Sequence, residues 1–115
     1  MSKDYKSITK DISSKLATFG KELPEVMDGF NKLVKFSTTE GALEPKTKEF
    51  IALALGIAAH CDGCIGFHVH KLVKLGVTKE EFNEVLGMAV YMGGGPSMMY
   101  AAEALMAYEQ FASAS

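Results

Sequence analysis

Apolar residues recur at intervals of three and four along nearly the whole chain, and this spacing limits the fold more than any other feature. Two such stripes are Ile8, Ile12, Leu16 and Phe19, and Val26, Met27, Phe30, Leu33 and Val34. These intervals place apolar side chains on one face of an α-helix, whereas a half-buried strand requires alternation, which is nowhere sustained. The sequence therefore predicts an all-α fold.

Glycine, proline and polar residues divide the first half of the chain into helices. Gly20 suits the end of the first helix, and Pro24 suits the first turn of the second. A polar connector at 37–45 ends at Pro45, which predicts the start of a third helix.

The third expected helix, from Pro45 to about Ala59, is apolar on every face from Phe50 onward. A helix without a polar face is expected to be buried on all sides. In a domain of this size, this pattern predicts a subunit interface as well as a core, and hence an oligomer.

The second half of the chain predicts three more helices. A periodic segment runs from the cysteines to Gly76, and Thr78 and Glu81 form a capping box that begins the next helix. The sequence GGGP at 93–96 separates that helix from a last one over 97–111. The connectors are too short for a second domain, so we expect the 115 residues to form a single-domain bundle of about six helices.

Composition and charge exclude several classes of partner. The formal net charge is −2, without a run of basic residues, so we expect no nucleic-acid partner. The longest apolar run stops at His60, well short of the roughly 20 residues that a membrane span needs, so we expect no membrane partner. Residues 1–16 are polar and interrupted by charge, unlike a secretory signal peptide. We therefore expect a soluble, cytoplasmic protein.

The stretch HCDGCIGFHVH at 60–70 holds both cysteines and all the histidines of the chain. A bridge between Cys61 and Cys64 would close a very small loop and add little stability. If a helix begins near Cys61, its free N–H groups and its dipole would lower the thiol pKa, whereas Asp62 would oppose this effect. The pair therefore suits redox chemistry better than structural stapling.

Two further side chains could serve these thiols. His68 follows Cys64 by four residues, so on a helix both lie on one face and the imidazole can take up the thiol proton. Glu49 is the acidic residue of the apolar helix, and a buried carboxylate needs a partner. If the chain reverses near Cys61, Glu49 and His68 could face each other. Helix crossing or a bridging water must then close the difference between roughly 15 and 6 Å of helix rise.

The same residues also allow interpretations without redox chemistry. The cysteines could be two small, buried apolar side chains. A tetrahedral zinc site could instead use Cys61, Cys64, His68 and His70, although the last two diverge on one helix. Glu49 could balance the helix dipole or pair with Lys46 or Lys48. No role is predicted for His60 and His70, and the redox chemistry itself requires no metal or other cofactor.

The pattern of Glu49, eleven residues, Cys61, two residues, Cys64, three residues and His68 resembles the active-site signature of the AhpD-like alkylhydroperoxidases. These proteins are members of the carboxymuconolactone decarboxylase superfamily. The resemblance extends from about Glu44 into the last helix, where the sequence MGGGPSMMYAAEAL is also similar. The chain departs from AhpD between its cysteines, where Gly63 replaces a histidine.

The resemblance implies an all-helical subunit that assembles into trimers or hexamers. It also implies that Cys64 attacks a peroxide, that Cys61 closes the disulfide, and that His68 and Glu49 relay the proton through a bridging water. The expected partners are a hydroperoxide or disulfide substrate and an external dithiol reductant. The function that follows is a thiol-dependent peroxidase or disulfide oxidoreductase with an antioxidant role.

Two other functions remain as alternatives. Relatives in the superfamily decarboxylate a carboxylated lactone without a cofactor, but they typically lack the cysteine pair. A protein without enzymatic activity could instead use the disulfide as a redox-responsive switch of its assembly.

Overall fold

The computed structural model describes residues 2–113 and consists of six α-helices, without a strand in this part of the chain. The helices are α1 (Tyr5–Glu22), α2 (Pro24–Thr38), α3 (Pro45–Ala58), α4 (Asp62–Lys74), α5 (Lys79–Gly93) and α6 (Gly95–Ala112). The predicted all-α bundle is thus confirmed, including the number of helices.

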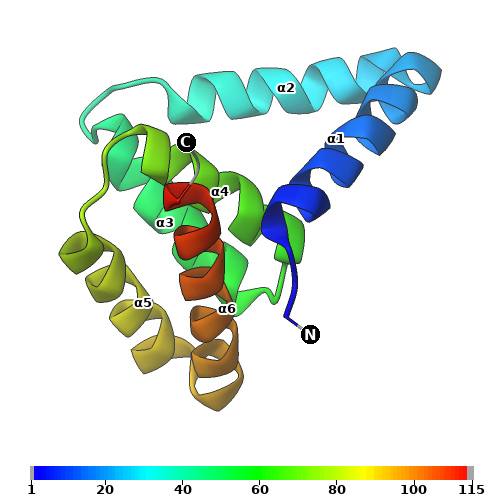
Figure 1. The fold of residues 1–115 in the computed structure, drawn as a ribbon. Coiled ribbons are helices and arrows are strands. Elements are labelled where there is room, and N and C mark those ends of the chain that lie inside the picture. The colour runs from blue at the N-terminus through cyan, green and yellow to red at the C-terminus, as the bar shows by residue number, and fades with distance from the viewer. Residues whose placement is uncertain (1, 114–115) are drawn as a thin grey trace.

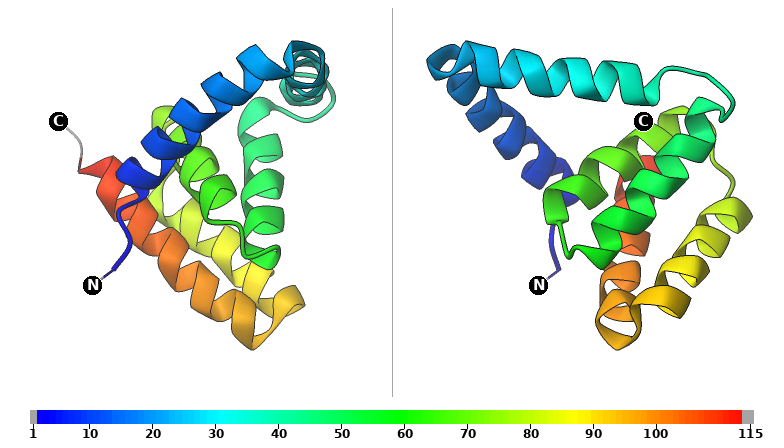
Figure 2. Two further views of the ribbon diagram at one scale, coloured as in Figure 1. Left: turned by 90° about the vertical axis from the view of Figure 1, so that its right-hand side faces the viewer. Right: turned by 180° about the vertical axis from the view of Figure 1, so that it is seen from behind.

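The six helices form two regions that differ in packing (Figure 1). Helices α3–α6 pack together and are called the body below. Helices α1 and α2 form a V, called the arm, in which α1 packs on α4 and α6 while α2 approaches only α1 and α3. Both views in Figure 2 show α2 standing apart from α5 and α6.

Side-chain caps are present at the starts of α1, α4 and α5. The side chain of Asp4 accepts a hydrogen bond from the Lys6 N–H at the start of α1. Thr78 and Glu81 form the predicted capping box of α5, with the hydroxyl of Thr78 accepting from the Glu81 N–H at 3.1 Å. This part of the sequence prediction is confirmed.

Two predicted helix boundaries are wrong. Helix α1 continues through Gly20 to Glu22, because this glycine serves packing: a Cβ here would lie 3.3 Å from Cγ of Met27 in α2. Helix α6 begins at Gly95 rather than near residue 97, since Gly94 takes a φ of 77° and ends the preceding turn there.

The core lies mostly in the body and is completed by Tyr5 of α1. Its fully buried side chains include Leu53, Ile57, Ile65, Val69, Leu72 and Phe82. A single chain does not bury α3 on all sides, because Ile51 is 48% and Leu55 65% exposed, so burial of its other side depends on the predicted subunit interface. Neighbouring helices cover one side of α3 and leave the other side open. Within the described residues, no helix is both long and apolar enough to cross a membrane.

Candidate active site

The two cysteines lie where the chain enters α4. Cys61 is the N-cap residue, Cys64 lies in the first turn, and a disulfide joins them with a Cα–Cα distance of 5.2 Å. The N–H of Cys64 donates a hydrogen bond to Sγ of Cys61 at 3.1 Å. The predicted position of the pair at a helix start is therefore correct, and a free N–H group of that turn points at a sulfur atom.

A tight reversal between α3 and α4 brings the cysteines back against α3. His60 takes a left-handed conformation with a φ of 57°, and its ring stacks on Tyr100 with centroids 4.6 Å apart. The N–H of Cys61 then donates to the carbonyl of Gly56 at 3.0 Å. A Cβ on Gly56 would lie 3.0 Å from Cβ of Cys64, so a glycine is needed for this close approach of the two helices.

Glu49 and His68 meet across the seam between α3 and α4. Nδ1 of His68 lies 2.7 Å from Oε1 of Glu49, whose side chain is almost fully buried. Because a carboxylate accepts hydrogen bonds, this contact places the proton of the neutral imidazole on Nδ1 and leaves Nε2 as an acceptor. The two side chains touch directly, so the bridging water expected between them is not needed.

The other pairings considered for Glu49 do not occur. Lys46 donates to Glu81 at 2.9 Å, and Lys48 donates to the carbonyl of Thr39 at 2.7 Å. The buried carboxylate therefore has His68 as its partner.

A groove of about 920 Å³ opens beside the cysteines, between the arm and α4. Its lining includes Cys61, Cys64 and His68 from the body and apolar residues such as Ile12 from α1 and Phe30 from α2. Of the described residues that line it, only the two cysteines and His68 carry groups suited to redox or proton-transfer chemistry. A small apolar molecule could reach the sulfur atoms and the imidazole through this groove.

The sequence did not predict the arm residues that line the groove. Ile12 and Phe30 lie about 30 to 50 positions before the cysteines, and local periodicity assigns them only to a helix face. A faint signal exists at Gly63, because a Cβ there would lie 2.8 Å from Cδ1 of Ile12. The glycine between the cysteines thus marks the place where α1 crosses α4.

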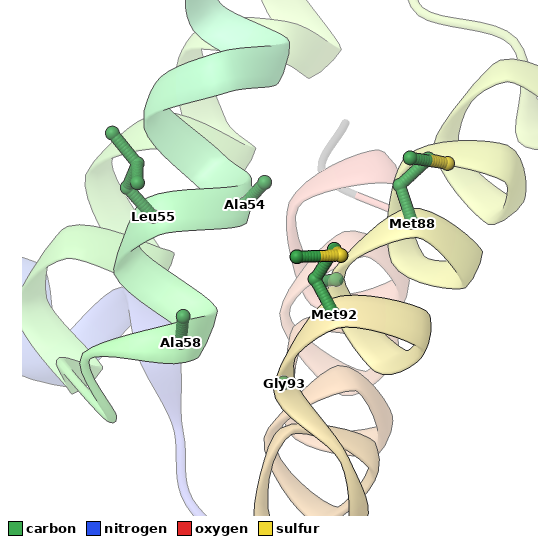
Figure 3. Close-up of a pocket in the computed structure, with 7 residues that line it drawn as sticks. Ala54, Leu55, Ala58, Met88, Met92 and Gly93 are labelled. Carbon is green, nitrogen blue, oxygen red and sulfur yellow. The ribbon is translucent and has the colours of Figure 1, made fainter.

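A second apolar groove, of about 280 Å³, lies between α3 and α5 (Figure 3). Its lining consists of Ala54, Leu55, Ala58, Met88, Ala89, Met92 and Gly93. None of these side chains can transfer a proton or act as a nucleophile, so this groove is not a candidate reaction site.

The remaining histidine has a different environment. The ring of His70 stacks on Phe111 with centroids 4.5 Å apart, and its burial, together with Lys74 and Lys6, lowers its pKa. His70 is not among the residues that line the cysteine groove. In residues 2–113, no three His, Cys, Asp or Glu side chains are grouped so that they could hold a metal ion.

Comparison with known proteins places most of the chain in a sequence family. Residues 24–107 match the model of the carboxymuconolactone decarboxylase family. An uncharacterized protein of Cupriavidus necator is 35% identical over 109 residues, covering 95% of this chain and 96% of the relative. An uncharacterized protein from the cox locus of Paracoccus denitrificans is 32% identical over 83 residues, covering 72% and 75% of the two chains.

Two solved structures share the fold. The apo crystal structure of a carboxymuconolactone decarboxylase family protein from Legionella pneumophila is 61% identical, with a TM-score of 0.92 over 94% of this chain and 96% of that one. A family protein from Thermotoga maritima is 28% identical, with a TM-score of 0.69 over 84% and 88% of the two chains. An involvement in the antioxidative response has been suggested for the Thermotoga protein.

Proposed function

The chain belongs to the carboxymuconolactone decarboxylase family, and from this premise we propose that it is a thiol-dependent oxidoreductase that reduces hydroperoxides or disulfides. The observation that carries the proposal is the Cys61–Cys64 pair at a helix start, in one groove with a histidine that Glu49 orients. The suggestion of an antioxidative role for the Thermotoga relative agrees with it.

The first step is activation of Cys64. In the reduced protein, Nε2 of His68 takes up the proton of the Cys64 thiol, and Glu49 stabilises the resulting imidazolium through Nδ1. The free N–H groups and the dipole at the start of α4 stabilise the thiolate.

The second step transfers oxygen and then closes the disulfide. The thiolate attacks the O–O bond of the hydroperoxide, so that an S–O bond forms and the alkoxide leaves with the proton from His68 as an alcohol. The sulfur of Cys61 then attacks the sulfenic acid on Cys64, an S–S bond forms, and water leaves. Cys61 suits this resolving role because its sulfur is within bonding distance of Cys64.

The third step restores the dithiol. An external dithiol reduces the Cys61–Cys64 disulfide by thiol–disulfide exchange and becomes a disulfide itself. All electrons come from this reductant, so the cycle calls for no bound cofactor. A reducing compartment such as the cytoplasm would supply the dithiol.

The direct test is a single-turnover reaction of the fully reduced protein with less than one equivalent of cumene hydroperoxide. We expect rapid, stoichiometric formation of an internal disulfide. Alkylation of the remaining free thiols and intact-mass measurement would detect it. Cys64→Ser should lose the reaction. Cys61→Ser is the matched control, and it should still react once and accumulate a sulfenic acid that dimedone traps. Full activity of Cys64→Ser, or oxidation no faster than that of a small-molecule thiol, would exclude the proposal.

The name of the family points to a second candidate, a cofactor-free lactone decarboxylase. That reaction has no need of two thiols, so a protein with serine at both cysteine positions should retain it. Turnover of a carboxylated lactone by this double variant would favour the decarboxylase.

A non-enzymatic switch of assembly is supported by one feature. The disulfide lies at the edge of a groove whose other wall is the arm, and α2 of the arm has no buried residue. A change of oligomeric state between reduced and oxidised protein, without turnover, would identify this function.

A further inference from the structure

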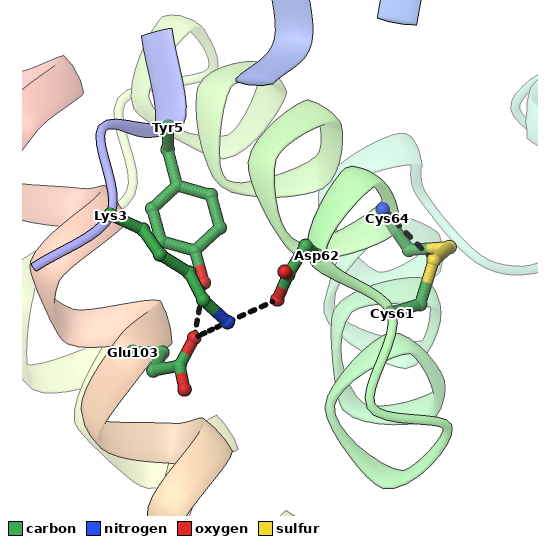
Figure 4. A network of polar contacts seen from close by, with 6 residues as sticks. All are labelled: Lys3, Tyr5, Cys61, Asp62, Cys64 and Glu103. Atoms are coloured by element: carbon green, nitrogen blue, oxygen red, sulfur yellow. Dashed lines mark hydrogen bonds and ion pairs between the residues drawn. A yellow bond between two sulfur atoms is a disulfide. The ribbon is translucent and has the colours of Figure 1, made fainter. Parts of the chain in front are cut away.

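Four polar side chains from three segments of the chain meet beside the start of α4 (Figure 4). Nζ of Lys3 donates to Oδ1 of Asp62 at 3.0 Å and to Oε1 of Glu103 at 2.6 Å. The hydroxyl of Tyr5 donates to the same oxygen of Glu103 at 2.8 Å. Asp62 directly follows Cys61 in the sequence, so this network ends next to the cysteine pair.

Gln110 of α6 holds the N-terminal segment that carries two of these side chains. Nε2 of Gln110 donates to the carbonyl of Lys3 at 2.8 Å, and the N–H of Tyr5 donates to Oε1 of Gln110 at 2.7 Å. The hydrogen bonds to Glu103 and Asp62 raise the pKa of Lys3, so its ammonium stays charged. Burial and the bond to Glu103 raise the pKa of Tyr5, whose hydroxyl therefore remains a donor. The ammonium of Lys3 is thus fixed in place.

Asp62 has opposite effects on the helix and on the thiols. As an acidic residue in the first turn of α4, it interacts favourably with the helix dipole. The same negative charge opposes a thiolate on either neighbouring cysteine. Figure 4 shows its carboxylate pointing toward Lys3, with the Cys61–Cys64 bond on the other side of the helix start.

We propose that Lys3 is a positioning residue for the redox cysteines: it pairs with Asp62, holds the carboxylate away from the sulfur atoms and offsets its charge. The proposal rests on the proposed function for its purpose. The part of this effect that comes from holding Asp62 in place requires the carboxylate, whereas the direct effect of the ammonium does not.

The other charged groups at the cysteines do not depend on this network. His68 of α4 lines the groove, its partner Glu49 of α3 is buried, and their contact does not involve Lys3. The residues of α1 and α2 that line the groove are neutral. A change at Lys3 therefore removes its ammonium and releases Asp62 and Glu103, and it leaves the other charged groups at the cysteines in place.

The test is the pH profile of thiol alkylation by iodoacetamide, measured on the reduced full-length chain and resolved for Cys61 and Cys64 by peptide mass. Lys3→Met should move the profile to higher pH and slow alkylation near pH 7 by about two- to five-fold, as expected for one partly exposed charge pair. Lys3→Arg should restore the original profile. Lys10→Met, which removes an exposed lysine of α1, should leave it unchanged.

Asp62→Asn separates this electrostatic effect from simple anchoring of the N-terminal segment. This variant should react at least as fast as the unsubstituted protein. Adding Lys3→Met to it should slow alkylation less than Lys3→Met does alone, because only the direct charge of the ammonium is lost and no carboxylate is released toward the sulfur atoms. Equal slowing by Lys3→Met in both backgrounds, an unchanged profile, or slower alkylation of Asp62→Asn would overturn the proposal.

Alkylation needs no peroxide and no turnover, so its outcome is independent of the proposed function. Failure of the cumene hydroperoxide reaction with the expected alkylation pattern would reject the peroxidase and keep the role of Lys3. A successful cumene hydroperoxide reaction without the expected alkylation pattern would reject Lys3 as a positioning residue and keep the peroxidase.

Discussion

The arm and the body carry the same kind of apolar pattern in their sequences but bury it to very different extents. In the body, Leu53, Ile57 and Phe82 are fully buried, whereas α2 of the arm has no buried residue. The difference teaches that helical periodicity predicts a face that needs cover, but not whether the same chain provides that cover.

The arm leaves large apolar side chains in solvent. Phe30 is 60%, Leu33 62% and Phe36 72% exposed. Leu55 and the methionines of the groove between α3 and α5 form a second apolar surface on the body. Contiguous surfaces of this kind mark contacts between proteins. We therefore expect copies of the chain to associate, and the resemblance to AhpD suggests a trimer or a hexamer.

The largest expected effect comes from truncating a buried leucine of the body, and an exposed leucine of the arm provides the comparison. Leu53→Ala should lower the free energy of unfolding by about 2–5 kcal/mol, because it leaves a cavity in a closed core. Leu33→Ala removes a side chain that is exposed in a single chain, so at low protein concentration it should cost less than about 0.5 kcal/mol. Chemical denaturation of both variants measures the two values.

Measurements at several protein concentrations test whether a second copy of the chain covers the arm. If it does, the cost of Leu33→Ala should grow as concentration rises, since association stabilises the folded chain. The loss of free energy of unfolding that Leu53→Ala causes through its core cavity should be the same at every protein concentration. A monomer by light scattering, with an equally small effect of Leu33→Ala throughout, would contradict the expected oligomer.

The sequence predicted the parts of this molecule that depend on neighbours along the chain. The capping box at Thr78 and Glu81 and the helix start at Cys61 follow from local hydrogen bonding. The contact of Glu49 with His68 was predictable because a short reversal between two helices leaves few alternatives for a buried carboxylate.

The remaining features depend on tertiary contacts that no local pattern encodes. Lys3 lies 59 residues from Asp62 and 100 from Glu103, and nothing in the sequence connects them. Which face of α3 the chain itself covers could not be predicted, because composition does not reveal how many helices of the same chain surround it. Gly20 was assigned to a helix end because the sequence does not distinguish a glycine that allows close packing from one that ends a helix.

A smaller effect tests the joint between the two regions at Gly66. A Cβ at this position in α4 would lie 2.6 Å from Cγ2 of Thr9 and 3.4 Å from the ring of Tyr5, both in α1. Thr9 cannot easily move aside, because its hydroxyl donates to the carbonyl of Tyr5 at 3.0 Å. Gly66→Ala should therefore push the arm from the body and cost about 1–3 kcal/mol.

Gly87→Ala is the matched control for Gly66→Ala. It also lies inside a helix, but a Cβ there meets nothing within 4 Å. This substitution should stabilise the protein by about 0.5–1 kcal/mol, because alanine loses less backbone entropy in a helix. Equal effects of the two substitutions in thermal melting would show that α1 does not pack on α4 as the structure describes.

The smallest expected effect is a pH dependence that belongs to the body. His70 stacks on Phe111, and burial with the nearby charges of Lys74 and Lys6 lowers its pKa in the folded state below the usual 6.5. Between these two values the unfolded chain binds more protons than the folded one, so stability rises with pH. The contribution of His70 is fully present above its unfolded pKa and is lost as pH falls through the folded pKa. Unfolding curves of the native protein between pH 5 and 7 should show this slope, and His70→Phe, which keeps an aromatic ring against Phe111, should flatten it.

The carboxylate of Glu81 does not confuse the comparison, because its backbone bond with Thr78 and its bond with Lys46 lower its pKa and place its own loss of stability at more acidic pH. An equal slope in both proteins would mean that His70 titrates alike in the folded and unfolded chains.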